Sequence, residues 1–347
     1  MDYVALIKRA FKITVRYRAL WLFGFFLALC GGVGNGGGGG GNGGGGGGEG
    51  GRFPFEGPSF NQPDMVTIIA VIAGIVVLVT VLVVVGIIVQ VVTRAAIIGM
   101  VNQVEETEAV TVKDGWRIGW SARAWRIFLV NLIIDLPSFV VFVVLLLLAL
   151  SPLLLLVTSQ KVFSVLGVVA AIGLFLLWVF LLLAFGVVIA PFKELGWRYA
   201  VLNERRPFDS LKESYALIRQ KLKDVAITVL VMLGLRIGWG VASFVLVIAT
   251  LVLGVIVGGI PAGIAYLLSK EVLTTVLVGL PFFLLAFIVP TAFVTGLYLV
   301  FQSSMWTLVF RALRARLPGA PELLPPGEPS PEEGEAAAPP DGAAEPA

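Results

Sequence analysis

Three polar side chains, Asn131, Asp135 and Arg236, fall inside long apolar stretches of the sequence. A charge in the middle of a bilayer costs from about 2.5 to more than 10 kcal/mol, so it needs a partner or water. Asn131 lies one helical turn before Asp135, on the same helix face. We predict that Asp135 and Arg236 pair, either as a structural bridge or as a substrate or proton site. In the alternative, each reaches the headgroups separately.

The residue inventory excludes most familiar enzyme chemistry. The chain has no histidine, and Cys30 is its only cysteine. Ser-His-Asp and Cys-His catalysis need an imidazole, and zinc sites normally use His or Cys. Carboxylate catalysis needs two acids that face one cavity, and only Asp135 lies within a predicted crossing. We expect no catalytic site, no metal and no cofactor, although carboxylate chemistry stays open.

The composition indicates that lipid surrounds the elements that carry these side chains. Hydrophobic residues make up 58% of the 347, and charged residues only 14%. Soluble domains contain roughly 25% charged residues. The apolar residues also form runs longer than the roughly 18 residues that indicate a transmembrane helix. We therefore predict an all-α integral membrane protein, a helical bundle over residues 19–316.

Six apolar segments predict six crossings of the membrane. They lie at about residues 14–33, 65–92, 127–150, 163–190, 225–258 and 272–301. The apolar run from 225 continues to 268, about twice the length that one crossing needs. Residues 259–268 are therefore either a re-entrant part or a further crossing.

The distribution of positive charge favours six crossings with both termini in the cytoplasm. With that topology, the cytoplasmic segments hold 21 of the 25 Lys and Arg residues, and the outer loops hold three. Cytoplasmic loops of membrane proteins carry an excess of Lys and Arg. A seventh crossing would move Arg311, Arg314 and Arg316 outside. We expect a protein of the bacterial cytoplasmic membrane.

Three segments flank or interrupt the predicted bundle. Residues 1–18 form a basic amphipathic helix suited to the membrane interface. Residues 31–64 form a glycine-rich outer loop that cannot bury apolar surface. Residues 318–347 are acidic, rich in proline and without a basic residue, which predicts a disordered cytoplasmic tail that is solvated or docks to a partner.

An internal repeat divides the chain into three units. A seven-residue pattern recurs in the inner loops, with Asp first, a basic residue fourth and an aromatic residue seventh. It occurs at residues 114–120 and 209–215, with a weaker copy from Asp2. Similar segments follow each return crossing, at 94–101, 197–202 and 305–311. We predict three units, each an interfacial helix followed by a transmembrane hairpin. Such repeats occur in transporters and equally in proteins that transport nothing.

Tryptophan and arginine alternate at one predicted inner end. The residues are Trp116, Arg117, Trp120, Arg123, Trp125 and Arg126. Indole rings favour the headgroup level, and arginine pairs with lipid phosphates. The flanking crossings favour a membrane surface over single-stranded nucleic acid. We predict a basic, tryptophan-rich rim that contacts anionic lipid, and no nucleic-acid partner.

Small residues at four-residue spacing occur at Gly234 and Gly238, at Gly254 and Gly258, and at Gly259 and Gly263. This spacing lets two helices approach closely. The contacts could form within the chain, which is our expectation, or between two copies in a homo-oligomer.

Three features resemble the prokaryotic multi-pass families related to the membrane domain of glycerophosphodiester phosphodiesterases. They are a basic helix leading into a short crossing at Arg18-Ala-Leu-Trp21-Leu-Phe-Gly, the glycine-rich outer loop, and the repeated Asp-x-x-Arg/Lys-x-Gly/Ser-aromatic inner helices. The resemblance covers residues 1 to about 316. It implies the same membrane architecture. It does not imply hydrolysis, because the enzymes use a separate soluble barrel with histidine ligands.

Together these patterns predict a non-enzymatic scaffold or accessory factor of the membrane. Its inner rim would engage anionic lipid or a protein partner. The alternative is a permease or lipid-handling transporter with a polar site at Asp135 and Arg236. A hydrated cavity that reaches Asp135 would favour the alternative.

Overall fold

The computed structural model describes residues 2–31, 65–157 and 161–316, and these residues form helices and short turns without a β-strand. The expected glycine-rich loop and acidic tail lie outside the described residues. The helices, in chain order, are α1 (Tyr3–Arg16), α2 (Ala19–Gly31), α3 (Met65–Thr107), α4 (Val112–Gly119), α5 (Ala122–Leu150), the 3-10 segment η1 (Ser151–Val157), α6 (Lys161–Leu202), α7 (Pro207–Gln220), α8 (Leu222–Ser269) and α9 (Val272–Arg314).

Five of the described helices are long and apolar enough to cross a membrane. They are α3, α5, α6, α8 and α9, and the bent pair α1 and α2 would make a sixth. The expected crossing at residues 14–33 divides between these two helices, which meet at 96°. Thr14 is buried in α1, and its carbonyl accepts a hydrogen bond of 2.6 Å from Trp21 Nε1 in α2. This bond ties the two helices together at the bend.

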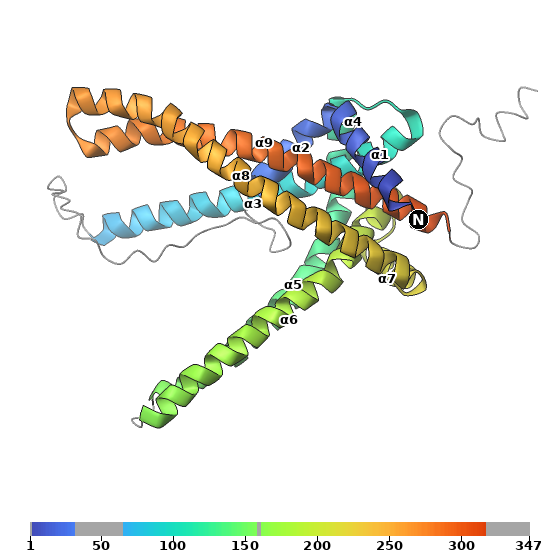
Figure 1. Ribbon diagram of the computed structural model, residues 1–347, viewed down its shortest axis with the longest axis horizontal. Helices are drawn as coiled ribbons and strands as arrows, with labels where there is room; N and C mark the ends of the chain where they lie inside the picture. Colours follow the sequence, from blue (N-terminus) through green and yellow to red (C-terminus); the bar gives the residue numbers. More distant parts are fainter. Residues whose placement is uncertain (1, 32–64, 158–160, 317–347) are drawn as a thin grey trace, which may run out of the picture.

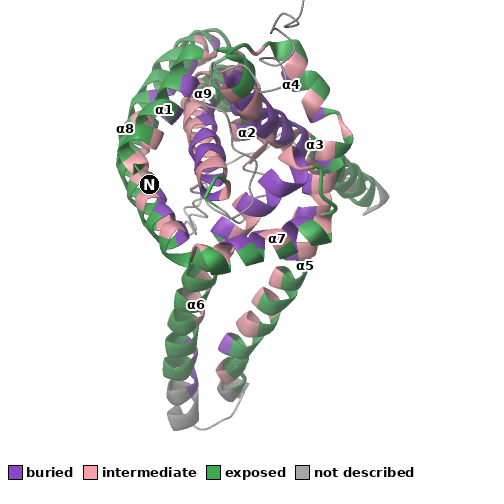
Figure 2. Cartoon of the chain, turned by 90° about the vertical axis from the view of Figure 1, so that its right-hand side faces the viewer, coloured by how far each residue is buried: buried purple, intermediate pink, exposed green. Residues whose placement is uncertain are grey.

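The molecule has two levels, which Figure 1 shows from the side. At one level, the ends of the long helices pack together with the short amphipathic helices; we call this the packed layer, residues 3–16, 91–135, 191–235 and 298–314. At the other level the helices diverge into apolar arms, residues 72–88, 136–154, 167–190 and 237–297. Figure 2 shows the buried residues concentrated in the packed layer.

The apolar arms bury almost nothing inside the chain. Every residue from 72 to 82 of α3 is exposed, so about three turns of this helix bury no side chain against the rest of the described chain. The most apolar windows of the five long helices are between 0% and 11% buried. A helix that is apolar all round is typical of a membrane span, because lipid takes the place of a protein core.

Each short amphipathic helix packs on one long helix of the packed layer. α4 lies on α3, α7 lies on α6, and α1 lies on α9. In α4 the buried face is made by Gly115 and Gly119, and a Cβ at Gly119 would come within 2.8 Å of the Val92 carbonyl oxygen. The missing side chains therefore let α4 lie directly against α3.

Glycines also allow close contacts between long helices. A Cβ on Gly24 of α2 would lie 2.6 Å from the Gly296 carbonyl oxygen of α9, and one on Gly258 of α8 would lie 2.9 Å from the Gly279 carbonyl oxygen. Gly254 and Gly258 thus serve packing within the chain, as expected. Gly234, Gly238, Gly259 and Gly263 have no described neighbour within 4 Å of such a Cβ. Intrachain packing was the wrong expectation for these four.

Residues 259–268 belong to the continuous helix α8, so they form neither a re-entrant segment nor a separate crossing. Pro261 lies inside the helix, which ends at Ser269, and Lys270 caps it in the left-handed conformation with φ 55°. At 1.5 Å per residue, α8 is about 72 Å long. Its first turns belong to the packed layer and its remainder to an apolar arm.

Candidate functional site

Charged residues gather at the junction between the packed layer and the apolar arms. Arg94 is the first charge after the apolar arm of α3, Lys193 is the first after the arm of α6, and Asp135 is the last before the arm of α5. All three helices contact one another at this level. The junction is therefore where the chain changes from apolar to polar surroundings.

Asp135 pairs with Lys193, not with Arg236. Lys193 Nζ lies 2.6 Å from Asp135 Oδ1, and the side chains are 14% and 56% exposed, respectively. Arg236 is exposed on α8 and forms no ion pair with a described residue. The predicted Asp135–Arg236 bridge is wrong because the α5–α6 hairpin already brings a lysine to the same depth.

Asn131 pairs with a tryptophan and not with Asp135, the residue that its spacing suggested. Its Oδ1 accepts a 2.8 Å hydrogen bond from Trp197 Nε1, rather than serving Asp135. The ring of Trp197 is buried, and the Arg94 guanidinium lies over it with its Cζ 4.0 Å from the ring centroid. Lys193 Nζ is 5.9 Å from the same centroid. The indole therefore organises the junction through its N–H and its face.

Arg198 is a functional candidate that sequence reasoning missed. It has no exposed surface, yet its Nη1 donates to Glu194 Oε2 at 2.6 Å and its Nη2 donates to the Ser303 carbonyl at 2.9 Å. The Arg198 Nε and the Ser304 Oγ are buried and have no hydrogen-bond partner among the described residues. The i,i+4 spacing of Glu194 and Arg198 was the available signal. The Glu194–Arg198 bridge lies within α6, and the hydrogen bond from Arg198 to the Ser303 carbonyl fastens α6 to α9 inside the packed layer.

The tryptophan rim is exposed, as a membrane-facing or partner-facing surface requires. Trp116, Trp120 and Trp125 are 58%, 60% and 62% exposed. The Trp116 and Trp120 ring centroids lie 5.9 Å apart, and Trp125 stacks on Phe128 at 5.1 Å. The glycine face of α4 lies against α3, so the two neighbouring indoles of this helix point away from the core.

The arginines of the rim have different environments. Arg117 is 80% exposed, whereas Arg123 binds Glu204 Oε1 through Nη2 at 2.9 Å and through Nε at 3.2 Å. The hydrogen bond and charge of Arg123 hold the pKa of Glu204 below its usual value. Arg126 Nη1 is buried, and no described residue accepts a hydrogen bond from it. Only part of the predicted rim is therefore free to meet a ligand.

α4 is fixed locally by a capping box. Thr111 Oγ1 accepts from the Asp114 backbone N–H, and the Asp114 carboxylate accepts from the Thr111 backbone N–H and hydroxyl. The hydroxyl bond is the main cause that lowers the pKa of Asp114. Such a box satisfies orphan N–H groups at both positions. It keeps this short helix, and with it two tryptophans, in a defined place.

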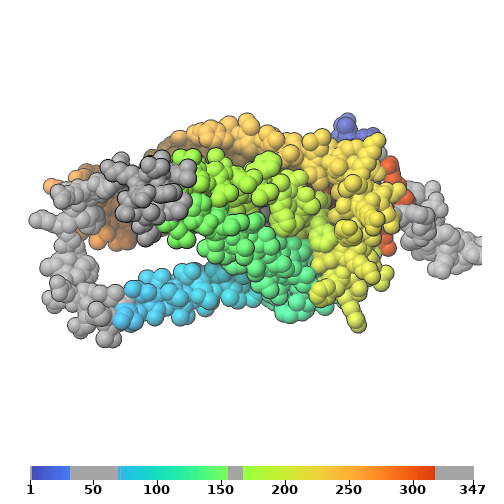
Figure 3. Space-filling model, turned by 90° about the horizontal axis from the view of Figure 1, so that it is seen from below, coloured from blue at the N-terminus to red at the C-terminus, as the bar shows by residue number. Residues whose placement is uncertain are grey.

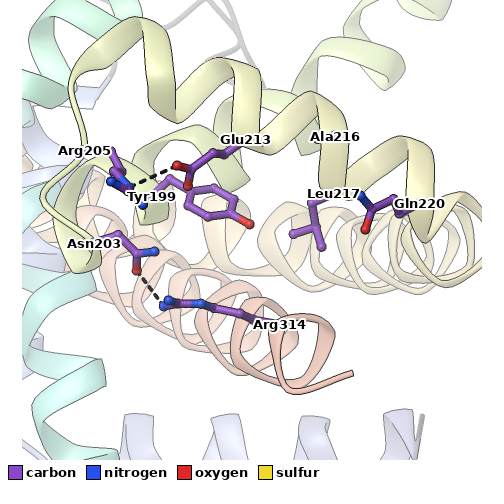
Figure 4. Close-up of a pocket in the computed structure, with 8 residues that line it drawn as sticks. All are labelled: Tyr199, Asn203, Arg205, Glu213, Ala216, Leu217, Gln220 and Arg314. Carbon is purple, nitrogen blue, oxygen red and sulfur yellow. Dashed lines mark hydrogen bonds and ion pairs between the residues drawn. The ribbon is translucent and has the colours of Figure 1, made fainter. Parts of the chain in front are cut away.

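An open recess of about 280 Å³ lies elsewhere in the packed layer, between α6, α7 and α9 (Figure 4). Tyr199 and Leu217 line it, Arg205 Nε pairs with Glu213 Oε1 at 3.0 Å, and Arg314 Nη1 donates to Asn203 Oδ1 at 2.7 Å. A neighbouring recess of about 440 Å³ shares some of these residues. Neither recess includes Asp135 in its lining.

The described part of the chain holds no cluster of three or more acidic or cysteine side chains that could bind a metal ion. The fold and the junction define a class: an all-helical protein whose apolar helices are long enough to cross a membrane. The chain matches the family of unknown function DUF7544 over residues 9–317, and it belongs to this family. No curated protein and no solved structure matches it.

Proposed function

We propose that this chain is a non-enzymatic scaffold or accessory factor of the bacterial cytoplasmic membrane, whose tryptophan rim binds an anionic lipid surface. The observation that carries the proposal is the outward placement of Trp116, Trp120 and Trp125 beside Arg117. Amphipathic indoles at the headgroup level and arginines near phosphates are typical of this kind of contact. The capping box and the glycine face of α4 preorganise the rim.

Charge supports six crossings with both termini in the cytoplasm, if α1 and α2 together count as one. The packed layer is rich in Lys and Arg, whereas the arms contain almost none. Cytoplasmic segments attract such an excess. The packed layer would then face the cytoplasm, and the rim would meet the anionic inner leaflet.

The order and packing of the helices support three repeated units of three helices, each beginning with a short amphipathic helix. The units would be α1–α3, α4–α6 and α7–α9. The short helix of each unit lies on the last helix of the unit before it, and α1 closes the cycle on α9. Arg311 and Arg314 at the end of α9 donate to Asn102 at the end of α3 and Asn203 at the end of α6. The arrangement resembles a pseudo-threefold ring.

The alternative of a permease has less support. It placed Asp135 and Arg236 at one polar site, and these residues have different surroundings. Neither described recess is lined by Asp135 or Arg236. A scaffold needs no cavity. The ion pairs Asp135–Lys193 and Glu194–Arg198 join charges of opposite sign, as structural contacts do.

Tryptophan quenching by lipids brominated close to the headgroup tests the proposal. The whole chain is reconstituted with brominated phosphatidylglycerol or brominated phosphatidylcholine. We expect stronger quenching by the anionic lipid, and loss of this difference in the variant with Trp116→Phe, Trp120→Phe and Trp125→Phe. Trp178→Phe, in the apolar arm of α6, is the matched control and should leave the difference unchanged. Equal quenching by both lipids would overturn the lipid-binding role and favour a protein partner.

A further inference from the structure

Arg94 differs from Lys193 because no group in the described part of the chain accepts a hydrogen bond from it. Its guanidinium lies over the Trp197 ring, with Cζ 4.0 Å from the ring centroid. None of its nitrogens donates to a described residue. Each nitrogen keeps some exposed surface. A guanidinium offers five N–H donors in a fixed fork. Its donor edge is therefore accessible and available.

The neighbouring charges are already matched in pairs. Asp135 pairs with Lys193, and Glu194 pairs with Arg198. These two carboxylates and two cations balance, so Arg94 adds one uncompensated positive charge. A half-buried cation without a counter-ion is costly, because desolvation disfavours the charged form. A single negative charge from a ligand would compensate it.

The position of Arg94 determines what kind of molecule can deliver that charge. Arg94 lies where α3 separates from the α5–α6 hairpin, and Figure 3 shows the outer part of α3, in light blue, standing clear of the rest of the molecule. Just beyond Arg94 the walls are apolar, with the partly buried Ile87, Ile133 and Ile189. A suitable ligand thus has an anionic head and a long apolar body.

We propose that Arg94, held on the Trp197 ring, binds the phosphodiester of a phospholipid whose acyl chains lie between α3 and the α5–α6 hairpin. Arginine binds phosphate oxygens through two parallel N–H donors, and such charge-assisted bonds are strong. Lys193, also beside the Trp197 ring, adds positive potential. This discrete site goes beyond the proposed rim and does not depend on it, except that both require the chain to lie in a membrane.

Native mass spectrometry of the purified full chain, titrated with phosphatidylglycerol or with diacylglycerol, tests the site. We expect one tightly held phosphatidylglycerol and no equivalent diacylglycerol, which has the chains without the phosphate. Arg94→Gln should weaken the tight site about tenfold or more, the effect of losing hydrogen bonds to a charged group. Arg219→Gln removes the same charge from an exposed site on α7 and should leave the affinity unchanged.

Further arms identify the source of the phosphate and separate this site from the rim. Inorganic phosphate should not displace the lipid; displacement would overturn the lipid assignment in favour of a free anion. If Arg94→Gln does not fold, Arg94→Lys should still weaken binding several-fold, because lysine lacks the planar fork. Unchanged affinity in the folded Arg94 variants would overturn the proposal. The triple Trp→Phe rim variant should keep the tight lipid, whatever the quenching experiment shows.

Discussion

At the scale of residues, three polar groups close to the apolar arms have specific protein partners. Asp135 meets Lys193, Asn131 meets Trp197, and Arg198 meets Glu194. Unpaired polar groups are expensive at low dielectric, so pairing allows these side chains to lie close to the membrane. The first two pairs connect α5 to α6, and Arg198 also donates to the Ser303 carbonyl of α9, so these contacts stabilise the level at which the arms separate.

A double-mutant cycle checks the Asp135–Lys193 pair. We expect Asp135→Asn and Lys193→Gln to couple by about 0.5–1 kcal/mol, because the carboxylate is partly exposed and polar pairs in membrane proteins are modest. Unfolding in detergent measures the free energies of the wild type, both single variants and the double variant. The control cycle replaces Lys193→Gln with Arg236→Gln, and its effects should add. Coupling in the control cycle, together with additive effects of Asp135→Asn and Lys193→Gln, would contradict the Asp135–Lys193 pair.

The buried Arg198 should respond more strongly. Glu194→Gln leaves the fully buried guanidinium without its carboxylate, and we expect a loss of about 2–3 kcal/mol of stability. The double change Glu194→Gln with Arg198→Met should recover part of this loss, because no uncompensated charge remains. Thermal unfolding gives the comparison. Glu213→Gln breaks the exposed pair with Arg205 and should cost less than about 1 kcal/mol; equal losses would refute the special role of burial.

At the scale of elements, the packing depends on missing side chains as much as on present ones. Gly115 and Gly119 bring α4 onto α3, and Gly24 and Gly296 bring the backbones of α2 and α9 together. Small residues are the usual means by which membrane helices approach each other. Short and long helices are thereby joined without the large apolar core of a soluble protein.

The contact between α2 and α9 predicts a sharp contrast between two glycines. Gly24→Ala places a Cβ 2.6 Å from both the Gly296 carbonyl oxygen and Val300 Cγ2, so we expect a loss of about 1–3 kcal/mol from overpacking. Gly173→Ala in the arm of α6 meets no described atom within 4 Å and should be neutral or gain up to about 1 kcal/mol of helix stability. Thermal unfolding in one detergent compares the two. A neutral Gly24→Ala would show that the helices can separate without cost.

At the scale of the whole molecule, the packed layer is stabilised by contacts within the chain, whereas the apolar arms depend on their surroundings. The layer and α2 contain the buried clusters, whereas the arms leave most of their apolar residues exposed. Such arms are unstable in water, but in a bilayer lipid covers their surface. The protein should therefore need a membrane or detergent to keep this shape.

The orientation of α8 and α9 is the most direct whole-molecule prediction. Because α8 is one continuous helix, reporter fusions after Asp209 and Ala320 should be cytoplasmic, and a fusion after Lys270 should lie outside. Alkaline phosphatase, active only outside, and green fluorescent protein, fluorescent inside, give opposite signals at each point. A fusion at Ala320 that reports the outside would contradict six crossings with cytoplasmic termini.

The sequence by itself determined the class of structure, because the hydropathy of the long runs and the scarcity of charge depend on local composition. The all-helical fold, the apolar helices and the amphipathic α1 and α4 follow from such local patterns. The exposed Trp116, Trp120 and Trp125 also follow, since aromatic residues between arginines do not fit a core.

Only the tertiary structure decided which polar groups meet. The distance between Asp135 and Lys193 depends on how the α5–α6 hairpin closes across 58 residues, and no local pattern gives that register. Likewise, Gly296 meets Gly24 rather than a nearer glycine because α2 packs on the last helix of the chain. Periodicity identifies the face of a helix, but the choice of partner is a property of the packed layer as a whole.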